Sequence, residues 1–389
     1  MKLVFITPGM TFGGAERVIS ILANIWCDMG HDVSIFITAT DRLPVYKLND
    51  KINVENYADF NENGVSHFKL ISSIRNFVTK EKPDCVLSFM NDVCAYTIIA
   101  LMGKNIPIIY SERNDPNKTN QSKINKLFRK IVEFGATHIV FQTEGAKQCY
   151  SKKVQRKSSI ILNPVELSRI PERKKEDINY SEIVTVARLE PQKNQDLLID
   201  AFNLVSKKHQ DIVLKIYGEG SLKNKLQNKI HELGLNDKVL LMGAKQDVLE
   251  WIKESYCFVL TSDFEGLPNS LIEAMCMGIP CISTDCSPGG ARQLLGDDRG
   301  LIVPCGDKER LAEAINMYLE NKDVAMKYGE VAFELRKEID CNKVAKEWIL
   351  KLFTKLVTTK TEKKLSHHNI GLALHSGFNA TEKKKTIAK

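Results

Sequence analysis

The chain has 389 residues, 43% of them hydrophobic and 26% charged, and a formal net charge of +7 at pH 7. This length is greater than that of one ordinary domain and predicts two packed cores. No apolar run approaches the roughly 18 residues that cross a bilayer, and the short apolar start lacks the cleavage site of a secretory signal. We therefore expect a cytoplasmic protein.

The ten cysteines and the modest positive charge argue against two further classes of function. The cysteines are scattered through apolar runs without a Cys-x-x-Cys pair, which predicts neither a disulfide framework nor a zinc site. The basic residues form no aromatic-interleaved stripe of the kind that binds nucleic acid. Anionic phosphates and membrane surfaces remain as possible partners.

Residues 1–165 alternate short apolar runs with helical patterns. Because parallel strands need crossover helices, this alternation predicts a doubly wound parallel sheet in a Rossmann-like domain. The first helix is expected over Ala15–Met29. The expected strands are Leu3–Thr7, Val33–Thr38, Asp84–Phe89, Pro107–Ser111 and His138–Gln142.

Residues 166–180 are charged, contain a proline and follow Asn163-Pro164, which together predict a linker. The alternation then restarts, and residues 181–343 are predicted to form a second Rossmann-like domain. Its expected strands are Ile183–Arg188, Ile212–Tyr217, Val239–Met242, Cys257–Thr261 and Pro280–Thr284. Its expected helices are Asn194–Lys207, Leu222–Leu233, Val248–Ser255, Ser270–Met277 and Asp307–Leu319.

The last part of the chain differs in character from the two predicted domains. Val344–Thr358 has the pattern of an amphipathic helix, with Trp348, Leu352 and Phe353 on one face, and such a helix can cross back to the first domain. Residues 359–389 are basic and poor in apolar periodicity, so we expect them to be disordered.

A first candidate for ligand binding is the loop Pro8–Arg17, which contains Gly13-Gly14 before the first helix. Paired glycines let the backbone approach a ligand closely, and the start of a helix offers N–H groups to an anion. The dinucleotide fingerprint G-x-G-x-x-G is absent. A plain tight turn explains the two glycines about equally well.

A second candidate is the pair of cations Arg188 and Lys193, between the first strand of the second domain and a helix that Asn194 caps. Open α/β sheets bind ligands at the carboxyl ends of their strands. The planar fork of arginine and the point charge of lysine both suit a diphosphate there. Two surface charges, with Glu190 as a local partner, are the alternative.

The strongest candidate runs from Ser262 to Ala274. A strand leads into a loop that carries Glu265, then Pro268-Asn269-Ser270 starts a helix, with Glu273 expected near its first turn. The free N–H groups of a helix start can take a phosphate, and two carboxylates in one crevice can accept hydrogen bonds from the vicinal hydroxyls of a sugar. Glu273 taken alone has a simpler explanation, because a negative charge near a helix N-terminus stabilises the helix.

In this order and in matching halves, the Gly-Gly loop, the Arg…Lys pair and the Glu-x7-Glu segment resemble the retaining family-4 glycosyltransferases. The resemblance covers nearly everything except the basic tail. It implies the GT-B architecture, in which two Rossmann-like domains face a cleft, with the acceptor on the first domain and the nucleotide-sugar on the second. Ser111–Pro116 is similar to members that build bacterial surface polysaccharides and protein-linked oligosaccharides. The implied reaction moves a hexose or N-acetylhexosamine from a UDP-linked donor to a glycan or polyprenyl-diphosphate-linked acceptor.

The resemblance also implies roles for individual residues. Arg188 and Lys193 would hold the donor's diphosphate and Glu265 the hydroxyls of its sugar, and these three are the expected catalytic residues. Glu273 would bind the ribose hydroxyls. The other expected donor-binding residues are Gly13, Gly14, Gly218, Glu219, Gly243, Gly266, Leu267, Pro268, Asn269 and Ser270. Many relatives carry a histidine where this chain has Glu112 and Arg113, which are the candidate acceptor-binding residues.

The resemblance favours a front-face displacement over the double displacement by two carboxylates that retaining hydrolases use. Because there is no Asp-x-Asp motif and Arg188 and Lys193 can do the work of a cation, we expect activity without a metal ion or other cofactor. Two alternatives are a nucleotide-sugar 2-epimerase of the same architecture and a non-catalytic nucleotide-sugar-binding protein.

Two basic clusters in the first domain suggest peripheral contact with the inner face of the cell membrane. A basic amphipathic helix can lie among lipid headgroups and attract anionic lipids, although a solvated face over the domain's core fits the pattern equally well. The first cluster has Lys118, Lys123, Lys126, Arg129 and Lys130 among Ile124, Leu127, Phe128 and Ile131. The second has Lys147, Lys152, Lys153, Arg156 and Lys157.

Overall fold

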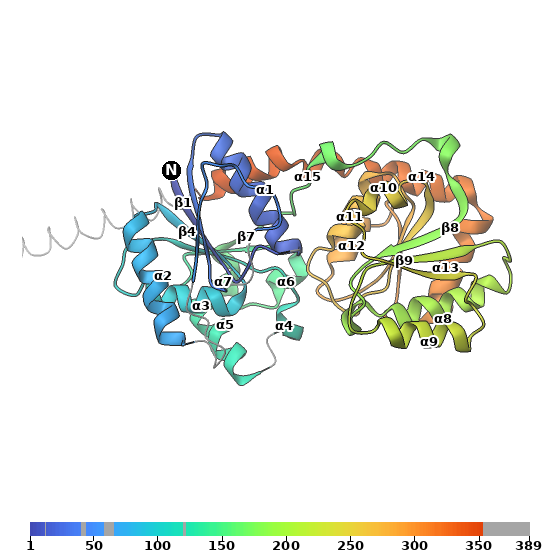
Figure 1. Cartoon of the computed structure of the whole chain (residues 1–389), viewed down its shortest axis with the longest axis horizontal. Coiled ribbons are helices and arrows are strands. Elements are labelled where there is room, and N and C mark those ends of the chain that lie inside the picture. The colour runs from blue at the N-terminus through green and yellow to red at the C-terminus, as the bar shows by residue number, and fades with distance from the viewer. Residues whose placement is uncertain (12, 40–43, 58–65, 120–121, 353–389) are drawn as a thin grey trace, which may run out of the picture. The chain divides into compact units, whose positions relative to one another are not determined.

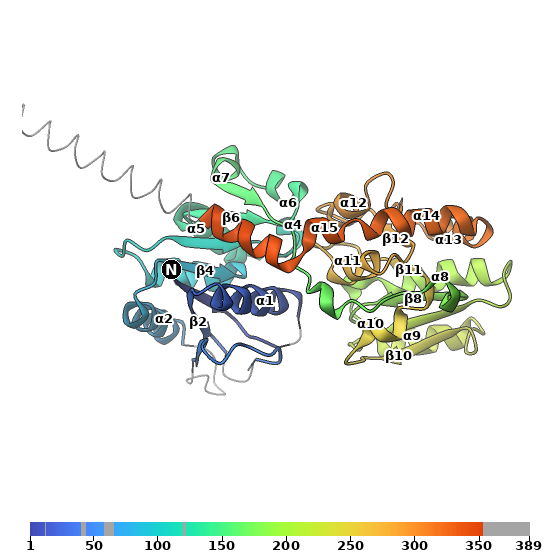
Figure 2. The same ribbon diagram turned by 90° about the horizontal axis from the view of Figure 1, so that it is seen from above.

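The computed structural model describes residues 1–11, 13–39, 44–57, 66–119 and 122–352. Two parallel sheets follow each other along these residues, and helices cover both faces of each sheet (Figures 1 and 2). The predicted α/β class, with two Rossmann-like doubly wound domains, is therefore confirmed. Both sheets belong to one compact unit, Met1–Ala345.

The first sheet has the strand order β3-β2-β1-β4-β5-β6-β7, and all its pairings are parallel. The order reverses between β1 and β4, so the loops after these two strands lead to opposite faces of the sheet. The strands are β1 (Lys2–Thr7), β2 (Asp32–Ile37), β3 (Asn53–Asn56), β4 (Cys85–Phe89), β5 (Ile108–Ser111), β6 (His138–Phe141) and β7 (Ser158–Ile160). The helices are α1 (Gly14–Asp28), α2 (His67–Glu81), α3 (Asn91–Ala100), α4 (Pro116–Thr119), α5 (Lys123–Gly135), α6 (Glu144–Gln148) and α7 (Lys152–Arg156).

The second sheet repeats this plan with the parallel order β10-β9-β8-β11-β12-β13, and its order reverses between β8 and β11. The strands are β8 (Asn179–Val186), β9 (Val213–Tyr217), β10 (Val239–Gly243), β11 (Ser255–Leu260), β12 (Cys281–Thr284) and β13 (Leu301–Val303). The α-helices are α8 (Gln195–Ser206), α9 (Lys223–Glu232), α10 (Val248–Ile252), α11 (Asn269–Cys276), α12 (Gly290–Leu295), α13 (Lys308–Glu320), α14 (Lys322–Phe333) and α15 (Arg336–Ile339). Short 3-10 turns form η1 (Leu167–Arg169), η2 (Lys175–Asp177) and η3 (Pro191–Lys193).

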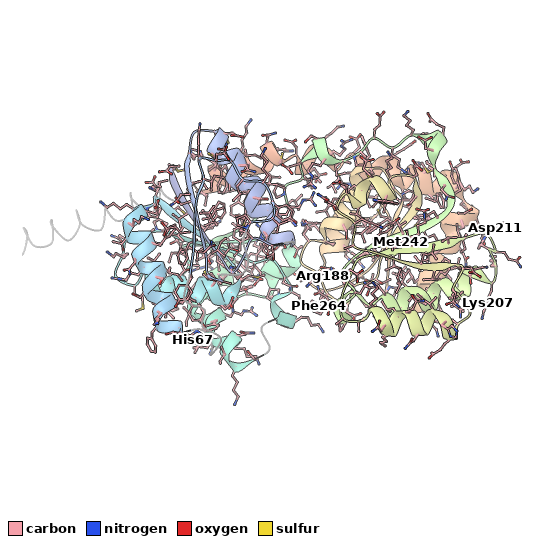
Figure 3. All side chains as sticks on the ribbon, in the orientation of Figure 1. His67, Arg188, Lys207, Asp211, Met242 and Phe264 are labelled. Atoms are coloured by element: carbon pink, nitrogen blue, oxygen red, sulfur yellow. The ribbon has the colours of Figure 1, made fainter. Side chains whose placement is uncertain are left out.

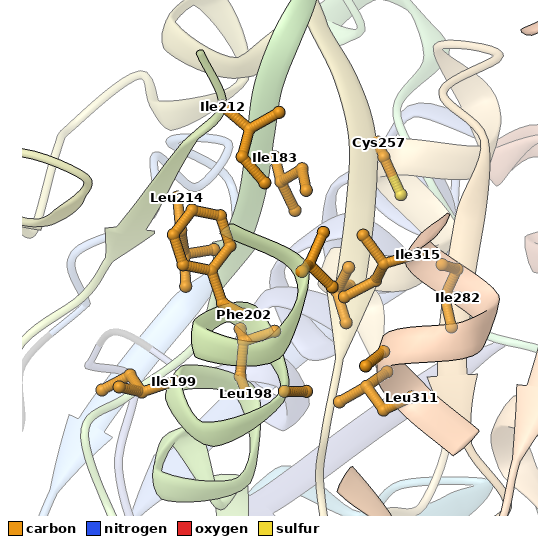
Figure 4. Packing of buried hydrophobic residues seen from close by; sticks show 14 of the residues in the cluster. Ile183, Leu198, Ile199, Phe202, Ile212, Leu214, Cys257, Ile282, Leu311 and Ile315 are labelled. Carbon is orange, nitrogen blue, oxygen red and sulfur yellow. The ribbon is translucent and has the colours of Figure 1, made fainter. Parts of the chain in front are cut away.

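Apolar side chains fill both faces of the second sheet. On one face, Phe202 of α8 and Ile315 of α13 pack with Leu214 of β9 in a buried cluster (Figure 4). On the other, Leu271 and Met275 of α11 belong to a second buried cluster. Because α8 and α11 are held on opposite faces, the loops that precede them leave the middle of the sheet side by side.

The structure corrects several predicted boundaries. The expected helix Val248–Ser255 ends at Ile252, because Ser255 already begins β11. The expected linker, residues 166–180, contains η1 and η2, and its last two residues begin β8, where the Asn179 amide donates to the Glu254 carbonyl at 2.8 Å. The edge strands β3, β7 and β13 were not predicted, since they are short and mostly partly exposed and lack the buried apolar run of the inner strands.

At the end of the described chain, residues 341–352 are helical. They include the first part of the expected helix Val344–Thr358. The Ala345 carbonyl accepts a hydrogen bond from the Trp26 indole at 3.1 Å, so the chain has returned to α1 by this residue. Phe353 and the basic tail, residues 359–389, lie outside the described residues. Within the described ranges, no helix combines the length and apolar character needed to cross a membrane.

Candidate functional site

The candidate site lies at the carboxyl ends of β8 and β11, which are neighbours in the middle of the second sheet. Arg188 follows β8 and Phe264 follows β11, so both loops leave the same edge of the sheet (Figure 3). The strand order reverses between these two strands, and open α/β sheets bind their ligands at such a point.

Hydrogen bonds join the two loops. The Thr261 hydroxyl donates to the Lys193 carbonyl at 3.0 Å, and the Asp263 amide donates to the Gln192 carbonyl at 2.9 Å. The Gln192 side-chain amide donates to the Phe264 carbonyl at 2.7 Å. The loops are thus fixed against each other, and the side chains that they carry have defined positions.

Lys193 and Glu265 form an ion pair between these loops, from Lys193 Nζ to Glu265 Oε1. Their side chains are only 15% and 9% exposed. The Ser262 hydroxyl donates to the same carboxylate oxygen at 2.8 Å. A buried charge is costly unless it is paired and hydrogen-bonded, so each of the two residues depends on the other.

Arg188 is exposed and forms no ion pair with any residue in the described part of the chain. The expected local partner, Glu190, is instead held by Ser221, whose backbone amide and hydroxyl donate to its carboxylate at 3.0 and 2.9 Å. These hydrogen bonds lower the pKa of Glu190, and the charge of Arg188 contributes least. The guanidinium of Arg188 is therefore available on the loop that also carries Lys193.

Glu273 is the fifth residue of α11, at the start of its second turn and close to the position expected. It is 7% exposed, and its carboxylate forms an ion pair with the Arg17 guanidinium of α1. A favourable charge at the helix N-terminus does not explain a buried carboxylate in this position. The partner from the first domain was not predicted.

The loop before α11 packs directly on the first domain. A Cβ atom at Gly266 would lie 2.4 Å from the Arg113 carbonyl oxygen, so no larger residue fits there without a shift. The Leu267 amide donates to Gln142 Oε1 at 3.3 Å, and its carbonyl accepts from Asn163 Nδ2 at 3.2 Å. Both domains therefore position the predicted donor-binding loop.

The start of α11 has a further link to the first domain. Asn163 Nδ2 donates to Asn269 Oδ1 at 2.7 Å, and Arg113 Nη1 donates to Asn163 Oδ1 at 2.7 Å. Pro268 occupies the N-cap position of α11, where its side chain forms no capping hydrogen bond. Ser270 lies in the first turn and is partly buried.

The other predicted donor-binding residues border the loop after β8 or begin α1. The Gly218 amide donates to the Gly243 carbonyl at 3.0 Å, and the Glu219 carbonyl accepts from the Leu189 amide at 3.0 Å. The side chain of Glu219 is exposed and pairs with Lys223, the first residue of α9. Gly13 has an extended backbone before α1, and Gly14 is the first residue of that helix. The donor-binding role of this set remains a prediction.

Glu112 and Arg113 hold the loop after β5. The Glu112 carboxylate is buried, accepts from the Tyr150 hydroxyl at 2.8 Å and from the Arg113 and Asn114 amides, and burial raises its pKa. The Arg113 guanidinium lies 4.5 Å from the centre of the Phe89 ring, and burial lowers its pKa to about 9. These contacts favour a structural role, and acceptor binding by either residue remains a prediction.

No group of three histidine, cysteine, aspartate or glutamate side chains in the described residues is placed to hold a metal ion. The expectation that activity needs no metal rests on Arg188 and Lys193 and remains a prediction.

Four polar residues of this site were not predicted: Arg17, Gln142, Asn163 and Gln192. Three of them lie in segments that the sequence analysis singled out. Arg17 ends the loop with the paired glycines, Asn163 is the first residue of the Asn-Pro pair, and Gln192 lies between Arg188 and Lys193. Gln142 ends an expected strand, and the sequence gives no sign that its side chain contacts the second domain.

Two family models match the chain. The model described as Glycosyltransferase Family 4 matches residues 12–169, and the model described as Glycosyl transferases group 1 matches residues 168–335. Together they span most of both sheets.

Bacterial proteins match over most of their length. The GalNAc-alpha-(1->4)-GalNAc-alpha-(1->3)-diNAcBac-PP-undecaprenol alpha-1,4-N-acetyl-D-galactosaminyltransferase of Campylobacter jejuni is 27% identical over 360 residues, which cover 90% of this chain and 97% of that protein. The lipopolysaccharide 1,6-galactosyltransferase of Salmonella typhimurium is 26% identical over 304 residues, covering 74% and 81% of the two chains. The crystal structure of Anabaena HepE in complex with UDP-glucose shares the fold, with a TM-score of 0.76 and 17% identity over 91% of this chain and 100% of that one.

The buried ion pair gives a prediction for stability. Lys193→Met leaves Glu265 buried without a cation and should lower the free energy of unfolding by about 3–5 kcal/mol. Adding Glu265→Gln should recover at least half of that loss. Lys208→Met, at an exposed ion pair with Glu320, is the control and should cost less than about 1 kcal/mol. Urea denaturation measures all three, and equal effects of Lys193→Met and Lys208→Met would contradict the account.

Proposed function

The chain belongs to the glycosyltransferases that join a family 4 domain to a group 1 domain, and on this premise we propose that it moves a hexose or N-acetylhexosamine, with retention of configuration, from a UDP-linked donor to a glycan or lipid-linked saccharide. One observation carries the proposal. Lys193, Glu265 and the exposed Arg188 lie together on the two loops at the switch point of the second sheet, next to the start of α11.

The charges of these loops suit a nucleotide-sugar. Arg188 and Lys193 offer positive charge to a diphosphate. Glu265 and Glu273 offer carboxylate oxygens to the hydroxyls of the sugar and the ribose. In the structure Glu265 balances Lys193, and a bound diphosphate would bring its own negative charge for that lysine.

Relatives support the classes of donor and acceptor. HepE, which shares the fold, was crystallised with UDP-glucose. The Campylobacter relative is named for an undecaprenol-linked acceptor and the Salmonella relative for lipopolysaccharide. A UDP-sugar and a glycan or polyprenyl-diphosphate-linked acceptor are therefore the proposed substrates, in the assembly of a bacterial surface polysaccharide or oligosaccharide in the cytoplasm.

The proposed reaction is a front-face displacement. The acceptor hydroxyl oxygen forms a bond to the anomeric carbon on the face from which the diphosphate departs. The bond from that carbon to the diphosphate oxygen breaks, and the hydroxyl proton passes to an oxygen of the leaving group. Arg188 and Lys193 stabilise the charge that develops on the leaving diphosphate. Glu265 is neutralised by Lys193 and bound by Ser262, which makes it a poor nucleophile.

The direct test of this function is a product assay with a panel of UDP-sugars and saccharide acceptors, with and without EDTA. Transfer or slow hydrolysis of one donor, with the anomeric configuration retained and activity unchanged by EDTA, is expected. An epimerised nucleotide-sugar would show the 2-epimerase instead, and binding without turnover would show a non-catalytic protein. Activity that is lost with EDTA and restored by Mg²⁺ or Mn²⁺ would contradict metal independence.

Removal of the exposed cation tests the mechanism. Arg188→Ala should lower turnover about 10²–10³-fold, the effect of losing one charge-stabilising contact to a leaving group, with little change in stability because the side chain is exposed. Arg310→Ala, at an exposed ion pair with Glu313, is the matched control and should leave turnover unchanged. Turnover of Arg188→Ala equal to that of the control would remove Arg188 from the mechanism.

We also propose that α5 contacts an anionic membrane. Its Ile124, Leu127 and Phe134 are 63%, 56% and 87% exposed and share one stripe of the helix. The neighbouring stripe carries the exposed Lys123, Lys126 and Lys130. An apolar stripe beside a row of lysines is the pattern of a helix that lies among anionic headgroups.

Several other residues of the two basic clusters make contacts within the first domain. Phe128 and Ile131 pack against the core of the first domain. Arg129 pairs with Glu133, and Lys147 pairs with Glu144. Lys157 is partly buried and donates to the Ala136 carbonyl at 2.5 Å. The membrane proposal therefore rests on the two stripes of α5 alone.

Vesicle sedimentation tests this surface. Binding to phosphatidylglycerol vesicles but not to phosphatidylcholine vesicles is expected. Replacing Lys123, Lys126 and Lys130 by alanine should weaken it about 100-fold, at roughly 1 kcal/mol for each lysine. Alanine at Lys207, Lys208 and Lys225, exposed lysines of the second domain, is the control. Binding that is equal for both lipids, or equal in the two triple variants, would contradict the proposal.

A further inference from the structure

We propose that Arg17 is a donor-binding residue supplied by the first domain, which moves from Glu273 to the donor's diphosphate when the ribose hydroxyls take up that carboxylate. The inference rests on the proposed function, because it needs a nucleoside diphosphate at the start of α11. Arg17 would be a third cation for the diphosphate, besides Arg188 and Lys193, and it comes from the first domain.

The ion pair between Arg17 and Glu273 is the first observation. Arg17 is the fourth residue of α1, and its Nη1 contacts Glu273 Oε1 in the second turn of α11. The two side chains are 17% and 9% exposed. A pair this buried is held closely, because either charge alone would be costly to leave without a partner.

The second observation is that the two helices meet at their N-termini. A Cβ atom at Gly14, the first residue of α1, would lie 2.9 Å from Nδ2 of Asn269, the first residue of α11. Each helix start carries partial positive charge on its free N–H groups. Arg17 brings a full positive charge to this region, which Glu273 balances in the structure. When the ribose hydroxyls take up Glu273, that charge is left to attract a diphosphate.

The chemistry of the two partners explains why Arg17 would change its contact. Glu273 can accept hydrogen bonds from the two hydroxyls of a ribose, and these compete with the arginine for the same oxygens. The Arg17 guanidinium is largely buried, so it needs another anion as a partner. The guanidinium fork matches two phosphate oxygens, and the start of α11 is where the diphosphate is proposed to lie.

A simpler role for Arg17 would be to tie the two domains together through Glu273. That role predicts the same effect of an Arg17 substitution on every ligand of the site. The proposed role predicts an effect that depends on the phosphates, since only a ligand with a diphosphate can bind Arg17. The ratio of diphosphate to nucleoside affinity therefore separates the two.

The test is calorimetric titration of the full chain with UDP and with uridine. Arg17→Ala and Arg17→Gln should both weaken UDP binding about 10–100-fold, the effect of losing a hydrogen bond to a charged group. Uridine should bind as well as to the wild type, or better, because its competitor for Glu273 is gone. Arg17→Lys should restore part of the UDP affinity, and Arg310→Ala should change neither ligand. Circular dichroism confirms that each variant is folded.

An equal loss of UDP and uridine affinity, or no loss of either, would overturn the inference. Glu273→Gln tests the proposed function separately and should weaken uridine and UDP alike. If it leaves uridine binding unchanged, Glu273 does not hold the ribose, and the exchange proposed here is wrong. A wild-type chain that binds none of UDP, GDP and ADP would contradict both the donor site and the role of Arg17.

Discussion

The pairing of buried carboxylates with buried cations at the edge of the second sheet is the interaction on which the rest of the site depends. Lys193 with Glu265, and Arg17 with Glu273, place full charges where little solvent reaches them. Such charges are tolerated only with well-placed partners. The same four groups match a nucleotide-sugar, since cations suit its diphosphate and carboxylates suit its hydroxyls. In the proposed function, the constraint that keeps the loops ordered also prepares them for a donor.

The topology explains how these groups come together. The reversal of strand order between β8 and β11 sends α8 and α11 to opposite faces, so that their preceding loops lie side by side at the carboxyl edge. The first domain adds polar side chains from the ends of its own strands. Gln142 and Asn163 bind the backbone of Leu267 just before α11 begins. The loop before α11 is therefore held by side chains of both domains.

The inner strands and the segments that carry the site residues could be predicted from the sequence, because each is one uninterrupted stretch with a pattern of its own. Buried parallel strands are apolar runs, whereas short edge strands such as β3 (Asn53–Asn56) are polar and partly exposed and carry no such signal. The boundary between α10 and β11 was missed because the polar stretch that joins them, Lys253-Glu254-Ser255, has no glycine or proline to mark the end of a helix. Arg188, Lys193, Glu265 and Glu273 each lie in a recognisable segment. The pairing of Arg17 with Glu273, 256 positions apart, depends on how the two domains meet, which no local pattern specifies.

The central claim is that cations at the carboxyl edge of the second sheet, together with the start of α11, hold the diphosphate of a sugar nucleotide. A crystal structure of the chain with bound UDP tests it most directly. The account predicts phosphate oxygens within hydrogen-bonding distance of Arg188, Lys193 and the first amides of α11, and the ribose against Glu273. A nucleotide bound at another edge of either sheet, or bound here with its phosphates turned away from these residues, would contradict it.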